Sequence, residues 1–244
     1  SLFNILLTSQ EEPKMKKILT ASVFLWISTL LHGQQLGQIT FSNGSGLAYF
    51  SIVADQGILI RISEDGKILE WGTELMSNRG NFYAPRLQPF MGRVEYYGPE
   101  ADSVTKGKVK SIGAISLTYY GAYETAVKAG KLRTAGTLIL DYFDNYDNSI
   151  LKGKLRSVGN LNIDYYSSFD EELLRGKLKT AGSTSITYYS SFDDKLIRGQ
   201  VKTIGSYTYT WYTSLDLHAG RGALKTGQYR QNIGSITYIL REGL

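Results

Sequence analysis

Two columns of side chains, repeated at intervals of 23 residues, are the strongest candidates for chemistry in this chain. The first column is basic and contains Lys110, Arg133, Arg156, Lys179, Lys202 and Lys225. A regular row of cations suits a linear polyanion such as an acidic polysaccharide or lipopolysaccharide head groups. The alternative is a solvated sheet face, whose lysines keep the protein soluble and block aggregation at sheet edges.

The second column is aromatic and contains Tyr120, Phe143, Tyr166, Tyr189 and Tyr212. If these rings are exposed in a row, they can stack on sugars. The alternative is that they pack across neighbouring strands and stiffen a sheet. Together, the two columns form the candidate ligand-binding surface.

Catalytic groups are scarce in the sequence. There is no cysteine, and after residue 33 the one histidine is His218. A Ser/His/Asp triad would have to use His218, which lies where the repeat degenerates and is interpreted as a solvated loop residue. Carboxylates such as Asp193 and Asp194 recur from unit to unit, which favours turn residues over a tuned acid/base pair. We therefore expect no enzyme, no cofactor and no metal site.

One segment of the sequence is rich in side chains that carry oxygen. The segment DYFDNYDN, residues 141–148, gathers Asp144, Asn145, Asp147 and Asn148. Calcium binds such loops in exported proteins, but the spacing does not match an EF-hand. Asp and Asn also serve turns through hydrogen bonds to their own backbone, and this is the preferred interpretation.

The elements that position these columns belong to an internal repeat. Glycines align at intervals of 23, as do an apolar column beginning at Val109 and an acidic column beginning at Glu124. Such a repeat implies a repeat architecture. Around residues 106–111 and 114–120, apolar and polar residues alternate on either side of Gly113, which predicts a β-hairpin in each unit.

The loop of this hairpin decides which residues share a face. A two-residue loop places Lys110 and Leu117 on the same face, whereas a three-residue loop with Gly113 at positive φ separates apolar from charged residues. We therefore predict the three-residue loop. The expected apolar face contains Val109, Ile115, Leu117 and Tyr119, and the expected polar face contains Lys108, Lys110, Ser116 and Thr118. Lys131, Lys154 and Lys177, which occupy the position of Lys108 in later units, are expected to reinforce the basic stripe.

The predicted fold class is all-β, with tandem 23-residue hairpins forming an extended, twisted antiparallel sheet. A β-solenoid is the alternative, but it places like charges about 4.8 Å apart on neighbouring strands. The apolar face needs a cover. The linkers between hairpins could supply it through Tyr123, Tyr146, Phe169, Phe192 and Leu215 together with Val127, Ile150, Leu173 and Leu196. Otherwise the sheet curls, or two chains pair face to face as a homo-oligomer.

The N-terminal residues predict export, and the range of the repeats predicts the domain boundaries. Lys16 and Lys17 precede an apolar run that is shorter than the roughly 20 residues of a membrane span, which predicts a secretory signal peptide within residues 1–33. No transmembrane helix is expected in the mature chain.

Residues 34–105 are interpreted as an N-terminal cap with divergent repeats, 106–227 as the regular repeats and 228–244 as a C-terminal cap strand, with 34–244 as one domain. The net charge of +5 does not point to nucleic acid.

The units GKVKSIG…LTYY and GKLRSVG…IDYY and the upstream GRVEYYG resemble those of secreted repeat proteins, without assigned activity, of Bacteroidota-type bacteria. The resemblance covers most of the mature chain and implies export and a β-rich repeat. In length and hairpin form the unit is also similar to MORN repeats. It lacks their Gly-rich, Trp-bearing strand, so phospholipid binding is not carried over.

These observations predict an exported, non-enzymatic protein in the periplasm, at the cell surface or outside the cell. It would bind or scaffold an extended polysaccharide or another envelope protein. Two alternatives stay open: a small outer-membrane β-barrel, favoured by alternating strands and abundant tyrosine, and an enzyme of unknown class that uses the acidic column or His218.

Overall fold

The protein is described here by a computed structural model covering residues 34–75, 86–217, 220 and 222–241. The expected signal peptide lies outside the described residues, as does His218. From Gln34 onward the chain forms one compact unit. Within the described residues the fold is all-β, with 20 strands and a single three-residue 3-10 helix at Asp55–Gly57. No helix in these ranges is long and apolar enough to cross a membrane.

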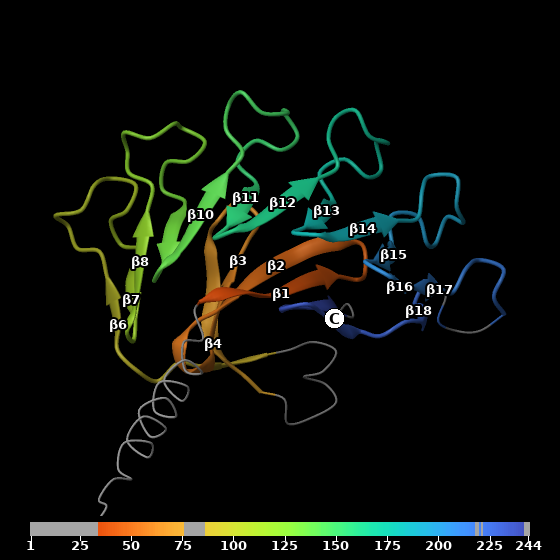
Figure 1. The fold of residues 1–244 in the computed structure, drawn as a ribbon, viewed down its shortest axis with the longest axis horizontal. Coiled ribbons are helices and arrows are strands. Elements are labelled where there is room, and N and C mark those ends of the chain that lie inside the picture. Colours follow the sequence, from red (N-terminus) through yellow and green to blue (C-terminus); the bar gives the residue numbers. More distant parts are fainter. Residues whose placement is uncertain (1–33, 76–85, 218–219, 221, 242–244) are drawn as a thin grey trace, which may run out of the picture. The chain divides into compact units, whose positions relative to one another are not determined.

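The repeat units form one eleven-stranded sheet in which neighbouring strands are antiparallel (Figure 1). Its strands follow chain order from edge to edge, which confirms the predicted hairpin sheet and excludes the solenoid. They are β6 (Val94–Tyr96), β7 (Val109–Ile112), β8 (Ile115–Tyr119), β9 (Leu132–Ala135), β10 (Leu138–Tyr142), β11 (Leu155–Val158), β12 (Leu161–Tyr165), β13 (Leu178–Ala181), β14 (Thr184–Tyr188), β15 (Val201–Ile204) and β16 (Tyr207–Thr208). β17 (Thr210–Trp211) and β18 (Leu224–Thr226) pair with each other beyond β16.

The expected three-residue hairpin loop is wrong. Ile112 pairs with Ile115, so only Gly113 and Ala114 lie in the loop. Gly113 does have the expected positive φ, at 58°. Apolar and polar residues still separate, because a β-bulge in each first strand reverses the side-chain alternation. Val109 and Ile112 therefore both face inward, although they are three positions apart in the strand.

A second, seven-stranded sheet is built from the two ends of the described chain, in the order β19-β20-β1-β2-β3-β4-β5. Its strands are β1 (Gln35–Ser42), β2 (Gly46–Val53), β3 (Ile58–Ile62), β4 (Ile68–Glu74), β5 (Leu87–Pro89), β19 (Arg230–Ile233) and β20 (Ile236–Arg241). All neighbours are antiparallel except β1 and β20. Most of the region interpreted as cap and divergent repeats, and the whole described C-terminal segment from residue 230, thus lie in this sheet.

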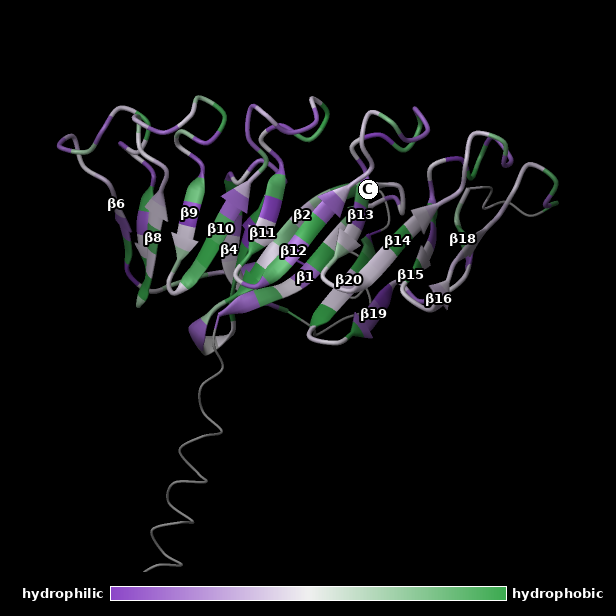
Figure 2. Ribbon diagram, turned by 45° about the horizontal axis from the view of Figure 1, so that its top comes forward, coloured by the Kyte–Doolittle hydropathy of each residue, from purple (hydrophilic) through white to green (hydrophobic). Residues whose placement is uncertain are grey.

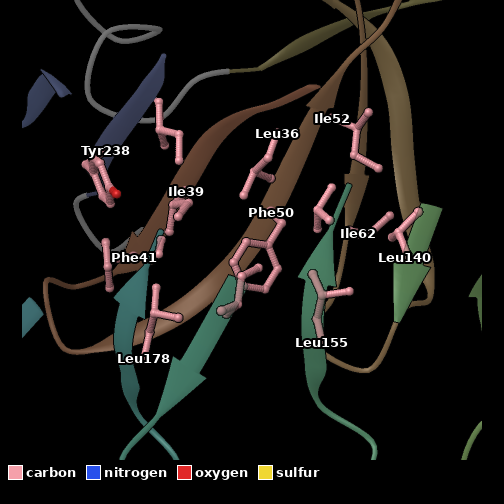
Figure 3. Close-up of a cluster of buried hydrophobic side chains, with 14 of the residues drawn as sticks. Leu36, Ile39, Phe41, Phe50, Ile52, Ile62, Leu140, Leu155, Leu178 and Tyr238 are labelled. Atoms are coloured by element: carbon pink, nitrogen blue, oxygen red, sulfur yellow. The ribbon is translucent and has the colours of Figure 1, made fainter. Parts of the chain in front are cut away.

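The second sheet covers the apolar face of the repeat sheet. Phe50 and Ile39 from one side and Leu140 and Leu155 from the other are fully buried in a single core (Figure 3). Backbone bonds also join the sheets: Leu155 N–H donates to the Glu64 carbonyl at 2.7 Å. Because the face is covered within one chain, it offers no surface for the homo-oligomer expected through it.

The linkers do not provide this cover. Their aromatic column is fully exposed, with Tyr123 at 103% and Phe192 at 95% of the reference accessibility. The loops project from one edge of the repeat sheet (Figure 2). Leu151, Leu174 and Ile197, each one residue after the expected aliphatic column, are the linker residues buried in the core. The second sheet therefore replaces the linkers as the source of the cover.

Candidate functional site

The outer face of the repeat sheet carries six cations, each placed over an aromatic ring of the preceding unit. The distances from the charged group to the ring centroid run from 5.2 to 5.9 Å. We call this set the basic–aromatic ladder. Its pairs are Lys110–Tyr97, Arg133–Tyr120, Arg156–Phe143, Lys179–Tyr166, Lys202–Tyr189 and Lys225–Tyr212. The structure thus brings the two predicted columns together, with Tyr97 added one unit upstream.

A β-bulge positions each cation of the ladder. Thr118 pairs with Thr134 and Tyr119 with Leu132, so Arg133 is the extra residue between them. The same shift occurs at the equivalent position of every other unit, including the last. A bulge re-aims the side chain of its extra residue. The fold therefore directs one basic side chain per unit onto the outer face.

The aromatic column is half-buried, and Tyr120 is only 9% exposed. The Tyr120 hydroxyl donates to the Leu140 carbonyl at 2.9 Å, and Tyr166 and Tyr189 make the equivalent bond to the next unit. The rings also stand edge-on against the inner tyrosines, as in Tyr120–Tyr142 at 6.1 Å. These rings join successive hairpins while supporting the cations.

Phe143 interrupts this pattern, and we expect Phe143→Tyr to stabilise the protein by about 1 kcal/mol. Among the described residues no hydroxyl donates to the Ile163 carbonyl, the acceptor that corresponds to Leu140 and Ile186. A tyrosine would supply this bond. Urea denaturation of both Phe143→Tyr and the reverse change Tyr166→Phe provides the measurement. The assignment is contradicted if Tyr166→Phe is more stable than the wild type. It is also contradicted if Tyr166→Phe is less stable while Phe143→Tyr has the stability of the wild type.

The second lysine column does not reinforce the outer stripe, contrary to expectation. Lys154 forms an ion pair with Glu64 at 2.7 Å, and Lys177 donates to the Ser45 carbonyl at 2.6 Å. Both acceptors lie in turns of the second sheet. Burial lowers the pKa of Lys177. The first strand starts one residue after this lysine, so strand alternation does not apply to it, and the side chain reaches across to the second sheet.

The acidic column caps the loops. The Asp193 carboxylate accepts the backbone N–H and the hydroxyl of Ser190, at 2.6 and 2.9 Å. Asp147 accepts the Asp144 N–H at 2.5 Å in the oxygen-rich segment, as the turn interpretation requires. No group of three or more metal-ligating side chains occurs within the ranges that the structure covers. These carboxylates are engaged in holding the loops.

The capped loops hold a row of apolar side chains in solvent. Ser167 and Ser190 hydroxyls accept the N–H of the tip residues Phe169 and Phe192. The row consists of Tyr123, Tyr146, Phe169, Phe192 and Leu215, each more than 85% exposed. The sequence analysis offered these side chains as one of three possible covers for the apolar face, and their exposure contradicts that option. Repeated exposure of large apolar residues marks a contact surface.

The ladder retains most of its positive charge. Lys179 and Lys225 approach Asp170 and Asp216, at 3.6 and 2.8 Å. The hydrogen bond from Lys225 lowers the pKa of Asp216 to about 2. For the other four cations, Lys110, Arg133, Arg156 and Lys202, no ion pair occurs in the part of the chain that the structure describes. Comparisons with family models, with curated proteins and with solved structures found no match for this chain.

Proposed function

We propose that this protein is a non-enzymatic, exported binding module of the cell envelope that holds an extended polyanionic glycan along the basic–aromatic ladder. The single observation that carries the proposal is the placement of one bulged cation over one ring in every unit. Successive units repeat after two strands, or about 9.6 Å. This spacing is comparable with a disaccharide, so a linear polymer of uronic acids would place every second carboxylate near the cation of a successive unit.

The rings favour anion binding for a physical reason. A carboxylate partner would cancel the charge of the cation, whereas an aromatic ring attracts the cation without neutralising it. The ring also restricts a long, flexible side chain before the ligand arrives, which reduces the entropy lost on binding. Arg133, Arg156 and Lys202 combine both features, because each contacts a ring and has an exposed side chain.

The test is calorimetric titration of the protein with polygalacturonate, a linear polymer of uronic acid, at several salt concentrations. We expect Arg156→Glu/Lys202→Glu to weaken binding by about tenfold or more and to flatten the salt dependence. The matched control is Lys152→Glu/Lys195→Glu, which makes the same charge change on exposed loop residues. Absent or salt-insensitive binding contradicts the proposal, as does an equal loss in the control.

A second candidate surface is favoured by the exposed row at the loop tips. The row tolerates Leu215 beside Phe169 and Phe192, which favours an apolar protein partner over stacking on sugars. We therefore propose an envelope protein as the partner of this edge. Pull-down of one defined membrane or cell-wall protein by the wild type, lost in Phe169→Ser/Phe192→Ser with polygalacturonate binding intact, would support it. Capture that the double variant leaves unchanged would contradict it.

A further inference from the structure

Both ends of the repeat sheet carry half of a hairpin. At one end the edge strand is β6, a second strand of the repeat unit. Its own first strand corresponds to residues 86–89, and there β5 pairs with β4 in the other sheet. At the opposite end the sheet stops at β16, and beyond it β17 pairs with β18, so the outermost strand there is β18, a first strand. Its second strand corresponds to residues 230–234, and there β19 pairs with β20. One edge therefore lacks a first strand, and the other lacks a second strand.

Among the described residues, β6 has a strand partner on one side only, which is β7. The Arg93 carbonyl accepts from Gly113 and the Tyr97 N–H donates to Lys108, so both face β7. Strand alternation then turns the backbone groups of Val94 and Tyr96 toward the free edge. Tyr96 is 56% exposed, whereas Tyr142 and Tyr188, at the same repeat position, are buried.

The β18 edge has the complementary group. In three interior hairpins the second-strand tyrosine donates its hydroxyl to the carbonyl that begins the first strand, as Tyr119 does to Val109 at 2.8 Å, whereas the Tyr165 hydroxyl has no such partner. Tyr142 and Tyr188 make the same bond. Leu224 occupies the position of Val109 at the β18 edge, and it is half-buried where Leu132 and Val201 are fully buried. Tyr96 and Leu224 are thus two halves of one repeated contact.

The loops carry a second, independent match. Four pairs of neighbouring loops are joined by a side-chain acceptor and a backbone N–H twenty residues later, as in Asp194 with Ser214 at 3.1 Å. The same bond joins Asp102 to Ala122, Asn148 to Ser168 and Glu171 to Ser191. In the last loop the acceptor position holds Leu217, which is 95% exposed. In the first loop the donor position holds Pro99, which has no N–H. An apolar side chain therefore replaces the acceptor where the donor is missing.

We infer that this protein assembles head to tail with further copies of itself, β18 of one copy pairing antiparallel with β6 of the next. The Tyr96 hydroxyl of one copy then donates to the Leu224 carbonyl of its neighbour, and Pro99 packs on Leu217. The contact joins two different surfaces, so it is heterologous and generates a filament or a ring. Main-chain pairing at a free sheet edge is the mode of association. The product is a longer repeat sheet.

The test is sedimentation of the full protein from micromolar to millimolar concentration, without any polymer. We expect the wild type to form a series of oligomers whose average size increases with concentration. Tyr96→Pro removes a free-edge N–H and the tyrosine hydroxyl, and Leu217→Glu places a charge against Pro99. Each variant alone is expected to be monomeric. An equimolar mixture of the two is expected to form 1:1 dimers, because each contributes its intact end.

A second variant at the first end guards against loss of folding. Pro99→Glu changes an exposed loop residue, leaves β6 unaltered and should act as Tyr96→Pro does. Unchanged thermal unfolding of Pro99→Glu and Leu217→Glu verifies that both are folded. The inference is overturned if the wild type stays monomeric throughout, if Pro99→Glu or Leu217→Glu alone assembles as the wild type does, or if the mixture of these two stays monomeric.

Discussion

Glu74→Gln is expected to destabilise the fold by about 3 kcal/mol at neutral pH, because it leaves a buried arginine without its counterion. Arg230 bonds both carboxylate oxygens of Glu74, at 2.6 and 2.9 Å, and Gln38 donates to the same carboxylate at 2.7 Å. The Glu74 and Arg230 side chains are only 11% and 14% exposed. The pair also joins β4 to β19 across four intervening strands, so the second sheet must curl for the two to meet.

The cost of this substitution depends on pH. Burial by itself raises the pKa of Glu74, but hydrogen bonds from Arg230 and Gln38 more than offset it and lower the pKa below its ordinary value near 4.5. A lowered pKa in the folded state means that the contribution is complete above the unfolded pKa and is lost as the pH falls through the folded pKa. The difference in free energy of unfolding between the wild type and Glu74→Gln should therefore be largest at neutral pH and should decrease below about pH 4.5.

Urea denaturation at a series of pH values measures this gap. Glu172→Gln, which alters an exposed loop carboxylate, is the matched control and should show almost no gap at any pH. A gap under 1 kcal/mol at neutral pH, or one that widens in acid, would show that the ion pair does not clamp the sheet.

The repeat sheet was predictable because its information is local and copied. Each unit brings an apolar column, a loop glycine at positive φ and a capping aspartate, and the structure places Val201, Gly205 and Asp216 accordingly. Strand alternation then gave the correct faces for Leu117 and Lys110. The structure of one hairpin can therefore be predicted from its own residues, without knowing which distant strands it contacts.

The hairpin register was mispredicted, and one column could have corrected it. A three-residue loop turns Ile112, Val158 and Ile204 toward the charged face, although all three are apolar and the structure buries them. That conflict indicates that the alternation of side chains shifts by one residue inside the first strand, which is what a β-bulge produces. The bulge also explains why the basic residue is the one that emerges on the outer face.

The second sheet could not be predicted from local patterns. β1 pairs in parallel with β20, although Gln38 and its partner Thr237 are almost the whole described chain apart. No turn or spacing in the sequence records this pairing. Without the second sheet, the sequence left three possible covers for the repeat sheet, and the apolar column of the linkers was the one available within the repeat itself.

Gly66→Ala is expected to destabilise the protein by about 3 kcal/mol, because this turn of the second sheet touches the repeat sheet. Gly66 has φ +80°, and an added Cβ would lie 2.7 Å from the Cε1 atom of Tyr142 and closer still to its hydroxyl. That hydroxyl bonds the Leu132 carbonyl at 2.7 Å, and the Leu132 N–H donates back to the Gly66 carbonyl. A displaced ring would break this buried arrangement.

Gly57→Ala is the matched control for this substitution. Gly57 has a similar φ of +72° in the 3-10 helix that connects β2 to β3, but nothing lies within 4 Å of its added Cβ. It should therefore cost only the backbone strain, about 1 kcal/mol. The difference between the two variants in urea denaturation isolates the close approach of the sheets. Tyr142→Phe removes the colliding hydroxyl, so Gly66→Ala should cost less in that background than in the wild type. If Gly57→Ala and Gly66→Ala lower the free energy of unfolding equally, the turn does not contact Tyr142 closely. The packing of the two sheets at this point would then differ from the one described.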